Sequence, residues 1–118
     1  MISMRVEFDD VDTEDDLHVV YQGEPFTGEV VERAPNGQIV ALTTYFNGME
    51  DGPSAEWYPS GEPKAAGAVR YGTAVGVHEF WHRDGGLAGR DEFDDSGRLL
   101  RRLRWAVDGT VVEDYSAT

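Results

Sequence analysis

Short segments of mixed apolar and polar residues alternate with glycine-containing turns along most of this chain. The segments have the length of β-strands, about 3 to 10 residues, and the glycines leave no room for a helix between them. They are residues 29–34, 38–45, 55–58, 64–71, 77–82 and 99–105. Residues 4–8 and 17–21 form two further expected strands before this series, and residues 110–115 form a closing one. We therefore predict an all-β fold.

Glycine and tryptophan recur along the chain with a spacing of 24 residues. Three series share this spacing: Gly37, Gly61, Gly85 and Gly109; Gly28, Gly52 and Gly76; and Trp57, Trp81 and Trp105. A period of about 20 to 50 residues indicates one supersecondary unit that is copied and stacked on its neighbours. We expect the unit to be a β-hairpin, and the stack to be an elongated, twisted antiparallel meander.

The turns divide into two sets. One turn is expected at four equivalent places, residues 35–37, 59–61, 83–85 and 107–109, each ending in a glycine that can adopt positive φ. Return turns between hairpins are expected at residues 47–52 and 72–76. We predict a single domain over residues 1–118, with capping strands and an acidic segment in 1–20, hairpin repeats in 21–111 and a C-terminal tail in 112–118.

Composition limits the class of protein. The chain has 118 residues, of which 40% are hydrophobic, so one domain with a core is expected. Cysteine is absent, which excludes disulfides and thiolate metal ligands. Since no apolar run reaches the roughly 20 residues of a membrane-spanning helix and residues 1–16 lack a signal pattern, we expect a cytoplasmic protein without stable membrane insertion.

Charge is the second strong feature. Ten basic and 23 acidic side chains give a net charge of −13, which repels nucleic acid and anionic lipid and attracts a basic partner. Seven acids crowd residues 7–16: Glu7, Asp9, Asp10, Asp12, Glu14, Asp15 and Asp16. This segment is either a solvated run that keeps the protein soluble, or a docking surface to which Asp12, Asp15 and Asp16 contribute.

The order of aromatic, glycine and paired aromatic residues resembles the MORN-type repeats. One unit reads Tyr-Phe-Asn-Gly over residues 45–48 and Trp-Tyr-Pro-Ser-Gly over 57–61, and the next has Tyr-Gly at 71–72 and Trp-His-Arg-Asp-Gly at 81–85. The similarity covers roughly residues 21–111 and is greatest to the short bacterial variant found in antitoxin-like and immunity-like proteins. The first unit of the chain departs from the repeat pattern at Arg33, where later units have tryptophan. The resemblance implies an antiparallel hairpin stack and protein binding, often of a toxin, rather than catalysis.

One catalytic motif competes with this interpretation. Residues 78–82 read His-Glu-Phe-Trp-His, the H-E-x-x-H pattern that binds zinc when it lies on a helix. The repeat register aligns His78 with Ser54 and His82 with Tyr58 in an expected strand, where positions four apart are separated by about 13 Å. No nucleophile elbow or phosphate-binding loop accompanies the motif. We expect no catalytic residue, no metal and no cofactor.

The aromatic residues are candidates for both packing and recognition. The three tryptophans recur in phase, which favours packing between units over a binding role. The opposite face of the expected strands carries a polar and aromatic strip that suits recognition, and a narrow open sheet cannot bury both faces unaided. The candidate partner contacts on this basis are Tyr45, Tyr58, Tyr71, Phe80 and His82.

These observations lead to one functional hypothesis and two alternatives. The hypothesis is a non-catalytic protein-binding module, an antitoxin or immunity protein that neutralises a basic toxin by stoichiometric binding. A membrane-associated MORN-type scaffold is the first alternative, although the acidity opposes binding to anionic lipid. A zinc hydrolase that uses His78, Glu79 and His82 is the second. Self-association through exposed sheet edges is possible with any of them.

Overall fold

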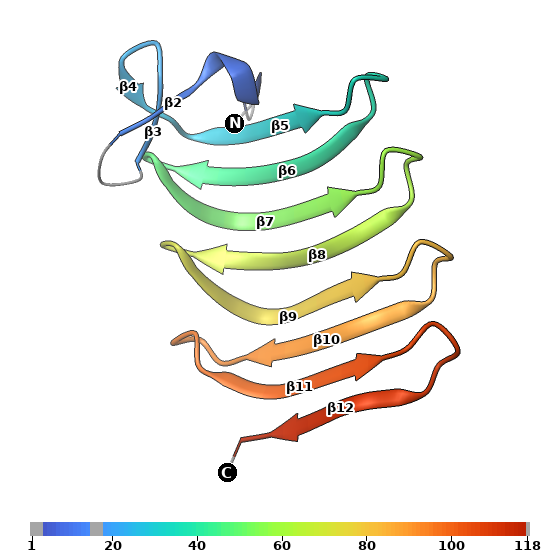
Figure 1. The fold of residues 1–118 in the computed structure, drawn as a ribbon. Coiled ribbons are helices and arrows are strands. Elements are labelled where there is room, and N and C mark those ends of the chain that lie inside the picture. The colour runs from blue at the N-terminus through green and yellow to red at the C-terminus, as the bar shows by residue number, and fades with distance from the viewer. Residues whose placement is uncertain (1–3, 15–17, 118) are drawn as a thin grey trace.

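The protein is an open, all-β meander, as the sequence predicts. The computed structural model describes residues 4–14 and 18–117. Eight antiparallel strands follow one another across a single sheet (Figure 1). They are β5 (Gly28–Arg33), β6 (Ile39–Phe46), β7 (Met49–Trp57), β8 (Pro63–Arg70), β9 (Thr73–Trp81), β10 (Leu87–Phe93), β11 (Leu99–Trp105) and β12 (Val111–Ser116). The segment 112–118, predicted as a tail, thus contains most of β12, a strand of the sheet.

One turn geometry recurs at the side of the sheet where β5, β7, β9 and β11 end. In the first of these turns the N–H of Gly37 donates to the carbonyl of Ala34, and the N–H of Ala34 donates to the carbonyl of Gln38. The same two bonds form around Gly61, Gly85 and Gly109, and all four glycines have φ between 88° and 102°. A left-handed residue after a tight turn produces a local bulge, and the strand register shifts at each of these hairpins.

The predicted return turns are wrong in extent. The turns are the two-residue pairs Asn47-Gly48 and Tyr71-Gly72, with φ of 52° and 88° in the first and 48° and 79° in the second. Two positive φ angles in succession are those of a type I′ turn, which matches the twist of the strands it joins. Residues 49–52 and 73–76 therefore already belong to β7 and β9, where Gly52 and Gly76 keep positive φ inside a strand.

The N-terminal residues cap the stack in a way that the sequence pattern did not predict. β1 (Arg5–Glu7) pairs with β5 in parallel rather than antiparallel orientation, and a short 3₁₀ turn, Phe8–Asp10, follows it. β2 (Asp12–Thr13), β3 (Val19–Tyr21) and β4 (Glu24–Pro25) form a separate small sheet. The predicted strand 17–21 corresponds to β3, and residue 17 lies outside the described residues.

The hydrophobic core is confined to this capped end. The buried hydrophobic side chains of residues 4–14 and 18–117 are Val6, Val19, Phe26, Val30 and Val31. Phe26 and Val19 from the cap pack with Val30 of β5 and Val6 of β1, and the ring of Tyr45 lies 6.5 Å from that of Phe26. From β6 onward the protein is therefore a single sheet without a fully buried hydrophobic side chain in the described region.

Candidate functional site

Pairing across the strands defines one face of the sheet, which we call the inner face. Residues opposite one another share a face, so two neighbouring rows can be followed from strand to strand. One row comprises Glu32, Ala41, Glu56, Ala65, Phe80, Gly89, Arg104 and Glu113. The other comprises Val30, Thr43, Ser54, Gly67, His78, Asp91, Arg102 and Tyr115.

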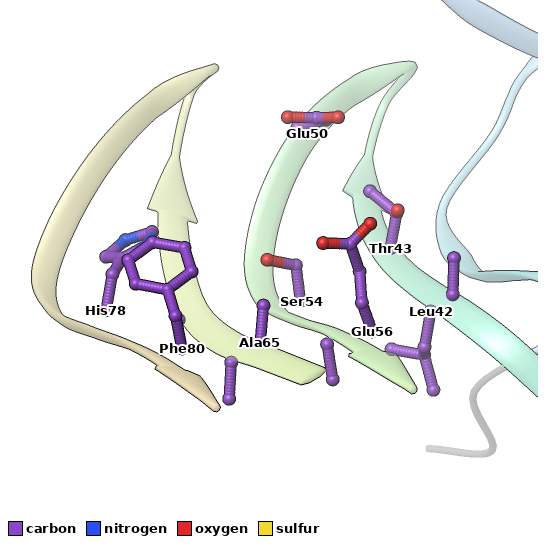
Figure 2. A pocket seen from close by; sticks show the side chains of 12 residues that line it. Leu42, Thr43, Glu50, Ser54, Glu56, Ala65, His78 and Phe80 are labelled. Atoms are coloured by element: carbon purple, nitrogen blue, oxygen red, sulfur yellow. The ribbon is translucent and has the colours of Figure 1, made fainter. Parts of the chain in front are cut away.

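A hollow lies in the inner face over the middle strands. Its volume is about 240 Å³, and Figure 2 shows the side chains that line it. The hollow exists because small residues, among them Ala41, Ser54 and Ala65, occupy adjacent positions of β6, β7 and β8. Glu56 lies between Ala41 and Ala65 in the same row, and Phe80 lies opposite Ala65 on β9.

At two glycines of the inner face, the space that a side chain would fill is taken by a side chain from a neighbouring strand. A Cβ atom added at Gly67 would overlap the imidazole of His78, whose Nε2 lies 2.9 Å from the carbonyl oxygen of Ala68. A Cβ atom at Gly89 would lie 2.9 Å from a terminal nitrogen of Arg104. The absence of side chains at these positions therefore allows a histidine and an arginine to lie flat on the sheet.

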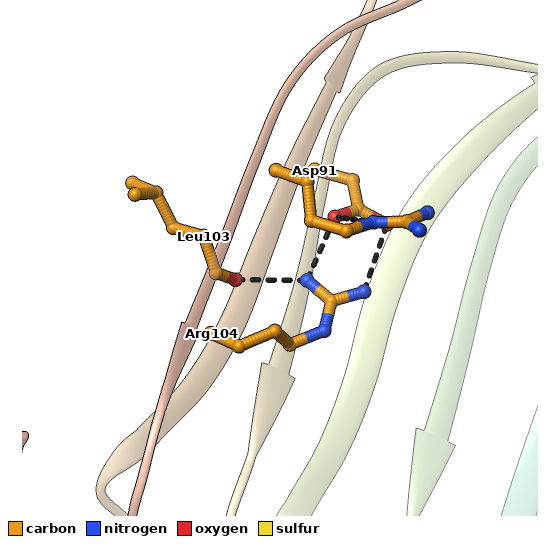
Figure 3. A network of polar contacts seen from close by, with 4 residues as sticks. Asp91, Leu103 and Arg104 are labelled. Atoms are coloured by element: carbon orange, nitrogen blue, oxygen red, sulfur yellow. Dashed lines mark hydrogen bonds and ion pairs between the residues drawn. The ribbon is translucent and has the colours of Figure 1, made fainter. Parts of the chain in front are cut away.

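Asp91 of β10 is the centre of a charged cluster. Its side chain is only 5% exposed, and both carboxylate oxygens accept hydrogen bonds from two arginines of β11. Arg104 donates at 2.7 and 3.2 Å (Figure 3). Arg102 donates at 3.1 and 3.2 Å. Arg104 also donates to the carbonyl of Leu103, and its guanidinium lies 5.1 Å from the centre of the Phe80 ring.

The arginines determine the ionisation of Asp91. Burial alone raises the pKa of this carboxyl, but the hydrogen bonds and positive charges of Arg104 and Arg102 outweigh burial, and the pKa lies below its ordinary value. In return, the hydrogen bond and charge of Asp91 raise the pKa of Arg102. With one carboxylate between two guanidiniums, the cluster carries one excess positive charge at the β11 end of the inner face.

The opposite charge dominates around the hollow. Glu50 and Glu56 both line it and are exposed, and neither forms an ion pair within the described part of the chain. The pKa of Tyr45 is raised, mainly by burial of its side chain and secondly by the negative charge of Glu50. The hollow therefore presents two uncompensated carboxylates beside hydroxyl groups of Thr43 and Ser54.

Tyr58 and His82, two predicted partner contacts, link successive hairpins. The hydroxyl of Tyr58 donates to the carbonyl of Trp81 at 2.6 Å, and Nε2 of His82 lies 2.9 Å from the carbonyl oxygen of Trp105. Both links join residues 23 apart at the same side of the sheet. In addition, the guanidinium of Arg83 lies 5.2 Å from the centre of the Tyr58 ring. Both polar groups are therefore used in holding neighbouring hairpins together.

The other predicted contacts are distributed over three places. Phe80 borders the hollow of the inner face, whereas Tyr45 and Tyr71 line a second and larger hollow of about 540 Å³ between the small sheet and β7. Asp12 lies in β2 and is exposed. Asp15 and Asp16 lie outside the described residues. The structure thus places the four described side chains of this set, Tyr45, Tyr71, Phe80 and Asp12, around the capped end and the middle of the sheet rather than in one patch.

Residues 78–81 of the H-E-x-x-H segment belong to strand β9, as the repeat register predicts, and His82 follows the end of that strand. His78 and Glu79 belong to β9, with His78 on the inner face and Glu79 on the other, where its carboxylate lies 3.5 Å from Arg90. A strand cannot bring these side chains together as a helix would. The described residues contain no group of three or more histidine, cysteine, aspartate or glutamate side chains that could hold a metal ion.

Sequence reasoning missed the two most distinctive features of the inner face. Alternation along the expected strand 99–105 puts Arg102 and Arg104 on the face opposite the tryptophans, but Asp91 lies in β10, which is not among the expected strands. Strand alternation combined with hairpin register would have set Asp91 opposite Arg102. Glu50 falls within the expected return turn 47–52, whereas the structure places it in β7. The three tryptophans are half-buried.

Comparison of the sequence with models of known protein families and with curated proteins finds no match. Within the residues that the structure describes, no helix has the length and apolar character needed to cross a membrane.

Proposed function

We propose that this chain is a non-catalytic protein-binding module that neutralises a basic toxin by stoichiometric binding. The observation that carries the proposal is the hollow of the inner face, where Glu50 and Glu56 are exposed without ion-pair partners among the described residues, on a chain of net charge −13. A cationic side chain that enters the hollow meets two carboxylates, two hydroxyl groups and the ring of Phe80. Such groups favour recognition of lysine or arginine.

The thinness of the sheet supports a binding role. From β6 to β12 the described side chains include no buried hydrophobic residue, so both faces are at least partly open to solvent. A partner that covers the inner face would exclude water from Phe80 and from the charged groups around the hollow. Desolvated contacts at the centre of an interface contribute most of its binding energy.

Electrostatics supports the choice of a basic partner. Opposed net charges accelerate encounter, and this acceleration falls as salt is added. If the toxin is a nuclease, acidic side chains on the inner face can occupy the positions of the phosphates that the enzyme binds. The resemblance of residues 21–111 to MORN-type repeats of antitoxin-like and immunity-like proteins agrees with this role.

Affinity capture tests the proposal. The protein would be immobilised, exposed to lysate of its native host, and washed at low and high salt before the retained proteins are identified by mass spectrometry. We expect one basic protein in near-equal amount, released by high salt. The double variant Glu50→Gln/Glu56→Gln should lose it, whereas Glu24→Gln/Asp95→Asn, which removes the same charge at exposed positions elsewhere, should retain it. Retention of an acidic protein, or equal loss with both variants, would contradict the proposal.

A further inference from the structure

β12 forms an exposed edge of the large sheet. Within the described residues it pairs with β11 alone, and all six of its residues are exposed. Among the described residues, eleven large hydrophobic side chains are exposed, and five of them belong to this end of the sheet: Leu100, Val107, Val111, Val112 and Tyr115. An edge strand presents a row of unpaired N–H and C=O groups to which another extended chain can bind. The edge therefore has both the backbone groups and the apolar surface that strand addition uses.

The pairing of β12 with β11 shows which side chains are compatible with a strand beside β12. Its partner β11 is basic, and the register sets Arg102 opposite Tyr115 and Arg104 opposite Glu113. The guanidinium of Arg101 also lies 3.7 Å from the carboxylate of Asp114. Opposite charges on neighbouring strands stabilise the pair, so a basic strand is matched to the acidic centre of β12.

A second copy of the chain fits this edge poorly. If two β12 strands paired antiparallel about their centres, either Glu113 would face Glu113 of the other copy or Asp114 would face Asp114, and like charges placed directly opposite are destabilising. Charged residues on an edge strand are a common means of preventing self-association. The same two acids favour a basic segment, so the edge discriminates between a copy of itself and a partner of opposite charge.

We propose that β12 is the docking edge for an extended basic segment of the partner. The segment adds a strand antiparallel to β12, sets two consecutive lysine or arginine residues against Glu113 and Asp114, and contacts Val112 or Tyr115 with an aliphatic side chain. Consecutive residues of a strand point to opposite faces, as do Glu113 and Asp114 themselves. This inference rests on the proposed function, because it specifies how a basic partner is held.

The test uses a synthetic peptide with the sequence of residues 99–105, Leu-Leu-Arg-Arg-Leu-Arg-Trp, which is the strand that β12 already accepts on its other side. The peptide would be titrated into the ¹⁵N-labelled full chain and followed by amide chemical shifts. We expect the largest shifts at residues 111–116. A peptide in which glutamate replaces each arginine should not bind.

Paired variants separate edge binding from general attraction to an acidic protein. Glu113→Gln/Asp114→Asn should weaken binding of the arginine peptide about 2- to 30-fold, the combined effect of two cross-strand charge pairs. Glu24→Gln/Asp95→Asn carries the same change in net charge and should leave the affinity unchanged. Circular dichroism of both variants would verify that the sheet is intact.

Two results would overturn the inference. Shifts confined to the hollow around Glu50 and Glu56 would place the basic segment on the inner face, and the edge would then have no role while the proposed function survives. Absence of peptide binding at low salt would reject the edge as a docking site. The capture experiment tests the proposed function separately, because its variants leave β12 unchanged.

Discussion

Replacement of Asp91 by asparagine is the most informative test of the inner-face cluster. The carboxylate is 5% exposed and accepts four hydrogen bonds from Arg102 and Arg104. An asparagine of the same size retains one acceptor oxygen and turns an N–H₂ group toward guanidinium donors, so about half of these bonds are lost. The two arginines would keep their positive charges close together without the carboxylate between them.

The expected destabilisation is about 2–3 kcal/mol. A hydrogen bond to a charged group contributes about 1.5–3 kcal/mol, and loss of one partner from a buried ion pair costs about 3–5 kcal/mol. The lower part of this range applies because the side chains of Arg102 and Arg104 are 37% and 30% exposed, and solvent screens their charges. The free energy of unfolding would be measured in urea at pH 7 for wild type, Asp91→Asn and the control Asp95→Asn, which changes an exposed turn residue.

The pH dependence of this difference has a definite sign. The pKa of Asp91 in the folded protein lies below its ordinary value of 3.8, so ionisation stabilises the fold at pH values above 3.8. The stabilisation is lost as the pH falls through the folded-state pKa. The difference between wild type and Asp91→Asn should therefore be largest at neutral pH and decrease below pH 3.8. A loss of less than about 0.5 kcal/mol at pH 7, equal to that of Asp95→Asn, would refute the reasoning.

Three further predictions concern the packing of the sheet and its chemistry. Gly67→Ala should destabilise the protein by about 1–3 kcal/mol in urea, because the added methyl group overlaps His78, whereas Gly86→Ala should change stability by less than about 0.5 kcal/mol. Tyr58→Phe should cost about 1 kcal/mol through loss of a hydrogen bond to the next hairpin, and Tyr71→Phe, at a side chain that is 65% exposed, should cost much less in the same assay. Zinc content measured after purification without chelator should remain far below one ion per chain, and stoichiometric zinc would overturn the interpretation of the H-E-x-x-H segment as an ordinary strand.

The regular part of the fold was predictable because its turns are encoded locally. Gly37 and its three counterparts supply the positive φ that this turn needs, and no neighbouring strand is required to recognise it. The predicted turns extended too far at Gly52 and Gly76, because a glycine with positive φ can also lie within a strand. A Cβ atom added at Gly52 would lie 3.0 Å from the side chain of Thr44, a close approach that exists only in the folded sheet.

The cap and the charged cluster depend on contacts between distant residues. Parallel pairing of β1 with β5 joins Val6 to Val30 across 24 residues, and nothing in the local pattern distinguishes it from an antiparallel hairpin. Asp91 similarly gains its role from Arg102 and Arg104 on the following strand. Alternation along β10 predicts which face Asp91 occupies, but its burial follows from the two arginines that lie across it.

The most direct test of the central claim is the association rate of the purified chain with its captured partner as ionic strength is varied. For a basic partner attracted by a chain of net charge −13, we expect a rate constant well above the unsteered 10⁵–10⁶ M⁻¹s⁻¹ at low salt and a steep fall as salt is added. The complex should contain the two proteins in equal amounts. A rate that does not change with salt, or a partner of net negative charge, would contradict the claim that this protein recognises its target through opposed charge.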